Sequence, residues 1–248
     1  MRIYFFSKKA LLTMGMIIFL ACGFLSFAFL SKDDVVSAVG TDQPIFQGNT
    51  DTKSVAITVN VDWGEEFIPE MLKEFKKNNA QVTFFVTGKW AEKNPELLKQ
   101  MSGEGHSIQN HGYRHCHFNQ LGSNEVGSEI KKAEDIIFKA TGKRSTFFAS
   151  PYGEYNPQLV KAVTGINYKY IMWSVDTIDW QRPNPATIVN RVMKKVHNDA
   201  IILMHPTEPT VKALPDMLKQ LQGQNYKMVT IDKITSGKVD AGSNSKHD

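Results

Sequence analysis

The feature that most constrains this chain is an alternation of short apolar runs with longer amphipathic segments, which begins at Ser54. The apolar runs are rich in β-branched and aromatic residues and carry few polar positions on either face. This pattern is typical of parallel strands that helices cover on both sides. We predict strands at residues 55–61, 81–87, 106–110, 146–150, 168–175, 200–204 and 227–231.

Between these runs, apolar residues recur at three- and four-residue spacing, as in helices with one buried face. Met71, Leu72 and Phe75 mark one such face, and Gly142 is a stop signal after another helix. Helices are expected at residues 69–79, 124–141, 186–196 and 211–222. Strands that alternate with helices predict an α/β fold with a parallel sheet of about seven strands, open or closed.

The N-terminus has a different character. Arg2, Lys8 and Lys9 precede residues 10–30, which carry no charge. About 20 apolar residues match the hydrocarbon thickness of a bilayer, and a basic flank favours the cytoplasmic side. We therefore expect residues 1–9 in the cytoplasm, residues 10–30 as a transmembrane anchor and the remainder outside the cytoplasm. The alternative is a cleaved signal peptide, which would give a secreted protein.

Residues 31–53 lack periodicity and are predicted to be a stalk. One domain is expected over residues 54–235, followed by a polar tail at 236–248. The net charge of +4 is small and scattered, which argues against nucleic acid as a partner. Cys22 and Cys116 fall in the membrane segment and the domain, so no disulfide is expected. We expect a monomer.

Polar residues follow five of the predicted strands. The carboxyl ends of parallel strands meet at one rim, where α/β folds collect their functional groups. A functional site is therefore predicted there. Its candidate residues are Asn60, Asp62, His111, Pro151, Tyr152, Asp176, Asp179 and His205.

His111 and His115 are four residues apart, so one helical turn would point both imidazoles the same way. Asp62 from a neighbouring strand end would complete a set of two histidines and one carboxylate. Three protein ligands with an open position suit catalytic Zn²⁺, and Co²⁺, Ni²⁺ or Mn²⁺ also accept these donors. His106 and His117 are expected to be a strand-end and a surface histidine.

Five segments resemble, in order, the five motifs of the polysaccharide deacetylase family (NodB homology domain, carbohydrate esterase family four). They read TVNVDWG at residues 58–64, GHSIQNHGYRH at 105–115, SPYG at 150–153, DTIDW at 176–180 and LMH at 203–205. The resemblance covers residues 54–234. The wording of the first segment, and HPT at residues 205–207, looks most like the spore-associated branch in Gram-positive bacteria.

The resemblance implies a distorted (β/α) barrel that removes acetyl groups from N-acetylated sugars in peptidoglycan or chitin-like polymers. In the family, a carboxylate takes a proton from water and a histidine gives one to the leaving amine. By position, Asp62, His111 and His115 would hold the metal. His205 would be the general acid, oriented by Asp176 or Asp179. Tyr152 would lend its backbone N–H to the oxyanion, and Pro151, Trp180 and Leu203 would line the substrate pocket.

Two residues depart from the family pattern. The position of the carboxylate base is Asn60, and an amide has no useful basicity at neutral pH. Ala149 replaces the arginine that holds this carboxylate in the family. The two losses are physically coupled, because a buried arginine without its partner is costly. Placing Asp62 as the base instead would leave Trp63 in the ligand position, so we interpret Asp62 as a ligand.

Three hypotheses follow from these departures. The first is a metal-dependent deacetylase with an unusual base, such as Glu65, Glu66 or Asp179. The second is a pseudoenzyme that binds metal and glycan as an envelope or spore factor. The third is a metal-free structural module in which the histidines only pack.

Overall fold

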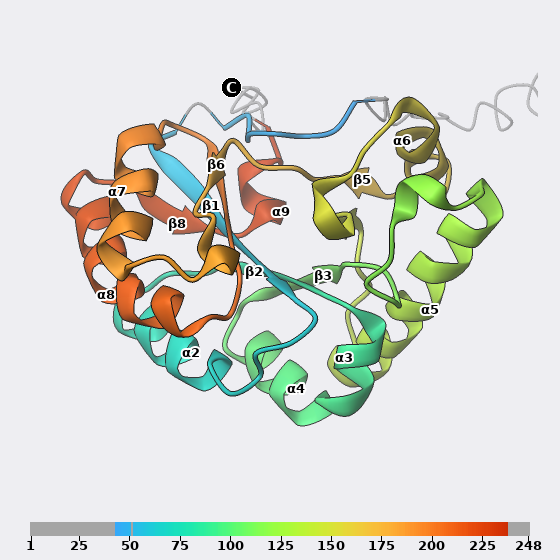
Figure 1. Ribbon diagram of the computed structural model, residues 1–248, viewed down its shortest axis with the longest axis horizontal. Coiled ribbons are helices and arrows are strands. Elements are labelled where there is room, and N and C mark those ends of the chain that lie inside the picture. The colour runs from blue at the N-terminus through green and yellow to red at the C-terminus, as the bar shows by residue number, and fades with distance from the viewer. Residues whose placement is uncertain (1–42, 51, 238–248) are drawn as a thin grey trace, which may run out of the picture. The chain divides into compact units, whose positions relative to one another are not determined.

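The computed structural model describes residues 43–50 and 52–237 (Figure 1). The predicted membrane segment at residues 10–30, its basic flank and most of the polar tail lie outside these ranges. Within them, no helix combines the length and apolar character needed to cross a membrane.

The described strands form one parallel sheet in the order β5-β4-β3-β2-β1-β7-β6, with β8 paired to β1. This half-barrel with flanking helices is consistent with the expected distorted (β/α) barrel. The strands are β1 (Ser54–Val61), β2 (Thr83–Val86), β3 (Ser107–Asn110), β4 (Phe147–Phe148), β5 (Lys169–Tyr170), β6 (Val175–Asp176), β7 (Ala200–Met204) and β8 (Lys227–Val229).

Six of the seven predicted runs contain one strand each, and the prediction of a single strand at 168–175 was wrong. This run contributes β5, which pairs with β4, and the start of β6, which pairs with β7 at the other end of the sheet. Apart from Lys169 and Ser174 the run is apolar or aromatic throughout, so the hydrophobic pattern gives no clear sign of the break. Between them, the Ser174 N–H already donates to the Ile201 carbonyl oxygen at 3.1 Å.

The central strand β1 is buried along its whole length. Ile57 and Val59 belong to the core under the helices, whereas Ala56 packs with Phe85 and Ile201 in a second cluster inside the half-barrel. Alternate β1 residues therefore face two different apolar environments, which explains why this run shows no polar alternation.

Helices flank the sheet, and the four predicted ones are confirmed with ends shifted by a few residues. They are α2 (Ile68–Lys77), α5 (Ser123–Thr141), α7 (Pro185–Lys195) and α8 (Glu208–Gly223). Four shorter helices were not predicted, namely α3 (Gly88–Lys93), α4 (Pro95–Gly103), α6 (Pro157–Thr164) and α9 (Ile231–Ile234). Pro95 and Pro157 occupy first turns, a start signal that periodicity alone overlooks.

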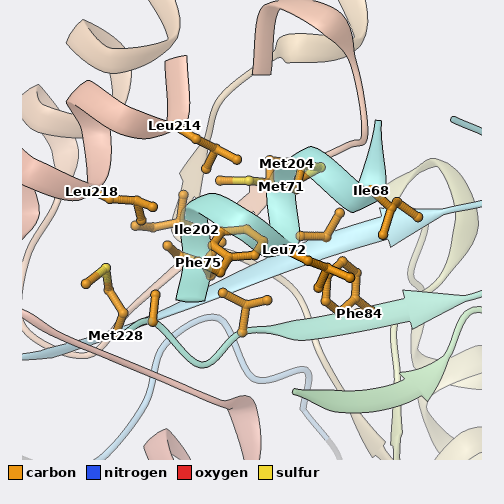
Figure 2. Packing of buried hydrophobic residues seen from close by; sticks show 14 of the residues in the cluster. Ile68, Met71, Leu72, Phe75, Phe84, Ile202, Met204, Leu214, Leu218 and Met228 are labelled. Carbon is orange, nitrogen blue, oxygen red and sulfur yellow. The ribbon is translucent and has the colours of Figure 1, made fainter. Parts of the chain in front are cut away.

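The predicted apolar face of α2 is confirmed. Met71, Leu72 and Phe75 are buried. Figure 2 shows them in one cluster with Phe84 of β2, Ile202 of β7 and Leu214 of α8. Burying each large apolar side chain stabilises the fold by about 1.5–3 kcal/mol. This layer supports the sheet from the helix side.

Residues 43–50 belong to the fold, although the predicted stalk extends to residue 53. The Ile45 N–H donates to the Tyr170 carbonyl oxygen at 2.8 Å, and the Met172 N–H donates to the Ile45 carbonyl oxygen at 2.8 Å. Gln47 then bridges Ala200 at the start of β7. This segment therefore links the β5 side of the sheet to the β7 side.

His106 lies just before β3 and is only 4% exposed. The rings of Phe75 and Phe84 pack against it, and its Nδ1 accepts a hydrogen bond from the Val82 N–H at 3.2 Å. Burial lowers the pKa of His106 to about 4. In the unfolded chain this imidazole has an ordinary pKa near 6.5. Between about pH 4 and 6.5 it is therefore protonated in the unfolded chain but neutral in the folded protein.

This difference predicts a pH-dependent stability. The contribution of His106 is fully present above pH 6.5 and is lost as the pH falls toward 4, by roughly 3 kcal/mol in total at about 1.4 kcal/mol per unit. His106→Asn keeps an acceptor for Val82 but does not titrate, so its unfolding free energy should fall less over this range. Urea unfolding at several pH values measures it, and an unchanged pH slope would contradict the assignment.

Candidate active site

The loops at the carboxyl ends of the strands surround a cavity of about 570 Å³. Eight predicted site residues line it, together with Trp63, Gly153 and Trp173, which were not predicted. The eight are Asn60, His111, His115, Tyr152, Asp176, Trp180, Leu203 and His205. Pro151, Asp62 and Asp179 are not among the lining residues.

Cavities of about 340 and 770 Å³ lie at the opposite end of the sheet, and Gln81, His106 and Lys233 line both. Neither contains a predicted site residue. Size therefore does not identify the site. The site is identified by the polar residues that five strand ends bring to one cavity, four of which contribute titratable groups.

His205 is held by a buried carboxylate. Its Nδ1 lies 2.8 Å from Oδ1 of Asp179, which is 0% exposed. The other Asp179 oxygen accepts from the His205 backbone N–H and from the Thr210 hydroxyl, both at 2.6 Å. Three hydrogen bonds thus fix Asp179, which fixes the imidazole and leaves its Nε2 for the cavity. The residue that orients His205 is therefore Asp179.

Asp176 has a different environment. It lines the cavity and is partly exposed, and its Oδ1 accepts from the Ile178 N–H at 2.7 Å. Among the described residues, only one of its oxygens has a hydrogen bond, so the carboxylate retains acceptor capacity on the cavity side.

His111 is a buried, neutral imidazole. Burial, together with the charge effect of the neighbouring His115, lowers its pKa to about 3. The Nδ1 lies 2.7 Å from the Ala149 carbonyl oxygen, so this nitrogen carries the hydrogen and Nε2 keeps a free lone pair. Metal-binding histidines commonly have such a backbone partner.

His115 faces His111, with ring centroids 5.3 Å apart. Burial lowers the pKa of His115, while the charge of Asp62 opposes this shift. Both imidazoles are thus available in the neutral form that metal ligands require.

Asp62 is close enough for its charge to act on His115. Its Oδ1 accepts a hydrogen bond at 2.6 Å from the hydroxyl of Thr87, the residue that follows β2. In the ranges that the structure describes, no three His, Cys, Asp or Glu side chains are gathered as a metal-binding group. The donor types fit a divalent metal, and the triad of Asp62, His111 and His115 stays a prediction.

Asn60 is 7% exposed, and its Oδ1 is a buried oxygen without a hydrogen-bond partner. It follows Ala56 and Thr58 on the β1 face that looks into the half-barrel. Ala149 belongs to the apolar cluster on that same side and is 3% exposed. An unpartnered amide oxygen, with a small apolar residue on the same side of the sheet, fits the coupled loss of a charged pair.

The other candidate bases do not reach the cavity lining. Glu65 accepts a hydrogen bond from the Trp90 indole N–H at 3.2 Å, and Glu66 is exposed. Asp179 is committed to His205. Cys116 packs on the apolar cluster around Phe118, and burial raises the pKa of its thiol. Its surroundings are those of a residue that contributes to packing.

Trp63 lines the cavity but was not among the predicted site residues. Gly64 follows it with φ +81°, and a Cβ there would lie 2.4 Å from the Pro206 carbonyl oxygen. Only glycine allows this approach, which brings the β1 and β7 loops together. Trp63 consequently lies parallel to His205, with an interplanar angle of 6° and centroids 6.3 Å apart.

Comparison with known proteins agrees with these features. The family model described as polysaccharide deacetylase matches residues 47–171. YlxY of Bacillus subtilis, an uncharacterized protein, is 35% identical over 77% of this chain, which spans only 60% of that relative's length. A peptidoglycan-N-acetylglucosamine deacetylase of Bacillus cereus is 34% identical over 76% of this chain and 70% of its own length.

A solved structure adds a relative of another kind. A pseudoenzyme of the CE4 family from Bacillus anthracis is 37% identical, with a TM-score of 0.75 over 78% of this chain and 69% of its own. A mutant of that protein, with restored enzymatic activity, matches at 36% identity and the same TM-score. The matched family model and the similarity to the Bacillus cereus deacetylase show that this chain belongs to the polysaccharide deacetylase family.

Proposed function

We propose that this protein is a metal-dependent deacetylase that hydrolyses N-acetyl groups on cell-envelope polysaccharide. The observation that carries the proposal is the pair of His205 and the buried Asp179, 2.8 Å apart, on the wall of a cavity that also contains His111 and His115. A fixed imidazole beside two neutral ones supplies a proton donor next to potential metal ligands.

His205 is the proposed general acid. Asp179 holds the tautomer in which Nδ1 carries hydrogen, so Nε2 is the atom that delivers a proton to the leaving amine. The Trp63 ring lies parallel to this imidazole, with centroids 6.3 Å apart. A positioned acid of this kind contributes about 10²- to 10⁴-fold to a rate.

Asp62, His111 and His115 are the residues proposed to hold the metal, with Zn²⁺ first and Co²⁺, Ni²⁺ or Mn²⁺ as alternatives. A bound divalent ion would polarise the amide carbonyl and lower the pKa of water. This proposal is supported by the chemistry of the donors. Two are neutral imidazoles, and the third is a carboxylate whose charge raises the pKa of His115.

Asp176 is the proposed base. It is the carboxylate among the described residues that line the cavity, and its second oxygen is free to accept a proton from water. The earlier candidates Glu65 and Glu66 do not line the cavity, and Asp179 serves His205.

A second function, glycan binding without turnover, is favoured by Asn60. An unpartnered amide stands where the family has its base, and the pseudoenzyme of Bacillus anthracis is a relative of comparable similarity. In this case the cavity would bind the glycan as an envelope or spore factor.

We further propose that the domain acts outside the cytoplasm as a monomer. Residues 10–30 would anchor it to the membrane and residues 31–42 would form the remaining stalk, or cleavage would release it. Cell-wall glycan is the proposed substrate, since the relatives with named activities act on peptidoglycan.

The first test is acetate release from N-acetylglucosamine oligomers by the full-length protein, supplied in turn with each of the four metals. We expect release, and a loss of about 100-fold or more on His205→Ala with binding retained. Oligomer binding without acetate release under every metal would favour the non-catalytic function. Absence of both binding and metal uptake would leave only a structural module.

The second prediction concerns the base. Asp176→Asn keeps the acceptor for Ile178 but removes the basic oxygen, so acetate release should fall by about 10²-fold or more. Glu66→Gln, on an exposed residue outside the cavity, is the matched control and should leave the rate unchanged. Equal rates for Asp176→Asn and the unchanged protein would exclude Asp176 as the base.

The third prediction concerns the coupled loss. Asn60→Asp alone buries a carboxylate without a partner, and Ala149→Arg alone buries an unpaired guanidinium. Made together, the two should raise acetate release at least about tenfold beyond the product of the single effects. Rates of the four proteins measure this coupling, and multiplicative or absent gains would contradict it.

A further inference from the structure

Tyr152 has an unusual backbone for a bulky residue. Its φ of +60° lies in the left-handed region, and its side chain is 59% exposed while lining the cavity. Such a conformation costs of order 1–3 kcal/mol and persists only where neighbouring groups impose it. The contacts of the side chain therefore indicate what holds it.

Two histidines hold the Tyr152 ring. The His117 ring stacks on it with centroids 4.2 Å apart and an interplanar angle of 15°. The His115 ring meets it edge-on at 4.6 Å, and the Tyr152 hydroxyl lies 3.4 Å from the His115 carbonyl oxygen. Tyr152 thus contacts both the cavity residue His115 and His117, which is outside the cavity lining.

His117 is itself fixed by Glu154. Its Nδ1 lies 2.6 Å from Glu154 Oε1, and the other carboxylate oxygen accepts from the Asn119 N–H at 3.3 Å. The Tyr170 hydroxyl donates to the Glu154 backbone carbonyl, which anchors the main chain at this residue. A continuous series of contacts therefore runs from Glu154 through His117 to Tyr152.

We propose that His117 and Glu154 are positioning residues for glycan binding, because they fix the Tyr152 ring as a wall of the cavity. Neither side chain lines the cavity, so both act through Tyr152. The ligand class is the pyranose ring of an N-acetylated sugar, whose apolar C–H face packs against an aromatic ring. The inference rests on the proposed glycan binding but not on turnover.

The physical reason is preorganisation. An aromatic ring that is ordered before binding does not lose its side-chain freedom when the sugar arrives. The His117 and Glu154 side chains are 50% and 22% exposed, and exposed pairs of this kind add little to folding stability. Loss of the pair should therefore weaken binding and leave stability nearly unchanged.

The test measures binding of an N-acetylglucosamine tetramer to the full-length protein by calorimetry. Glu154→Ala and His117→Ala should each weaken binding about threefold to tenfold. Glu154→Gln keeps an acceptor for His117 and should restore most of the affinity. Glu134→Ala removes a comparable pair with Arg144, at 2.9 Å and outside the cavity, and should bind like the unchanged protein.

A double change separates positioning from other effects. If Glu154 acts through Tyr152, then Glu154→Ala should have no further effect on affinity in a Tyr152→Ala background. Unaltered binding by Glu154→Ala, or an equal loss in both backgrounds, would overturn the inference and leave glycan binding intact. Failure of the unchanged protein to bind the tetramer would instead overturn the proposed function, and this inference with it.

Discussion

The complete burial of β1 is the constraint on which the rest of the structure depends. Its neighbours β2 and β7 pair along its two edges, and its two faces separate the helix-side core from the interior of the half-barrel. The described strands are parallel and are arranged around β1. The loops after β3, β4, β6 and β7 therefore lie at the same rim as Asn60. The apolar core and the candidate site are thus two results of one packing arrangement.

Within the site, burial acts differently on each polar group. Asp179 is fully buried, and three hydrogen bonds compensate for its loss of solvent. The same hydrogen bonds hold His205 in a fixed orientation. His111 responds to burial by staying neutral, which suits a ligand. Asn60 has no such compensation for its Oδ1. The site therefore combines a well-supported imidazole at His205 with one unsatisfied polar atom at Asn60.

The sequence predicts much of this arrangement, because strands that are buried on both faces and helices with one apolar face leave clear periodic patterns. Eight predicted residues line the cavity for this reason. The break between β5 and β6 left no clear pattern, since nearly the whole run is apolar or aromatic. Trp63 and the series from Glu154 to Tyr152 depend on long-range approaches, such as Gly64 against Pro206, which no local spacing reveals. The choice between Asp176 and Asp179 likewise required the tertiary contacts of Thr210.

The segment around Ile45 has a mechanical consequence. It reaches the sheet laterally, through hydrogen bonds to Tyr170 and Met172, before the chain turns into β1 (Figure 1). The chain is therefore held to the sheet at Ile45 before β1 begins, in addition to the pairing of β1 with β2 and β7. Detachment at this point would also expose the interior residues Ile171 and Ile201 to water, so the attachment point and the core would fail together.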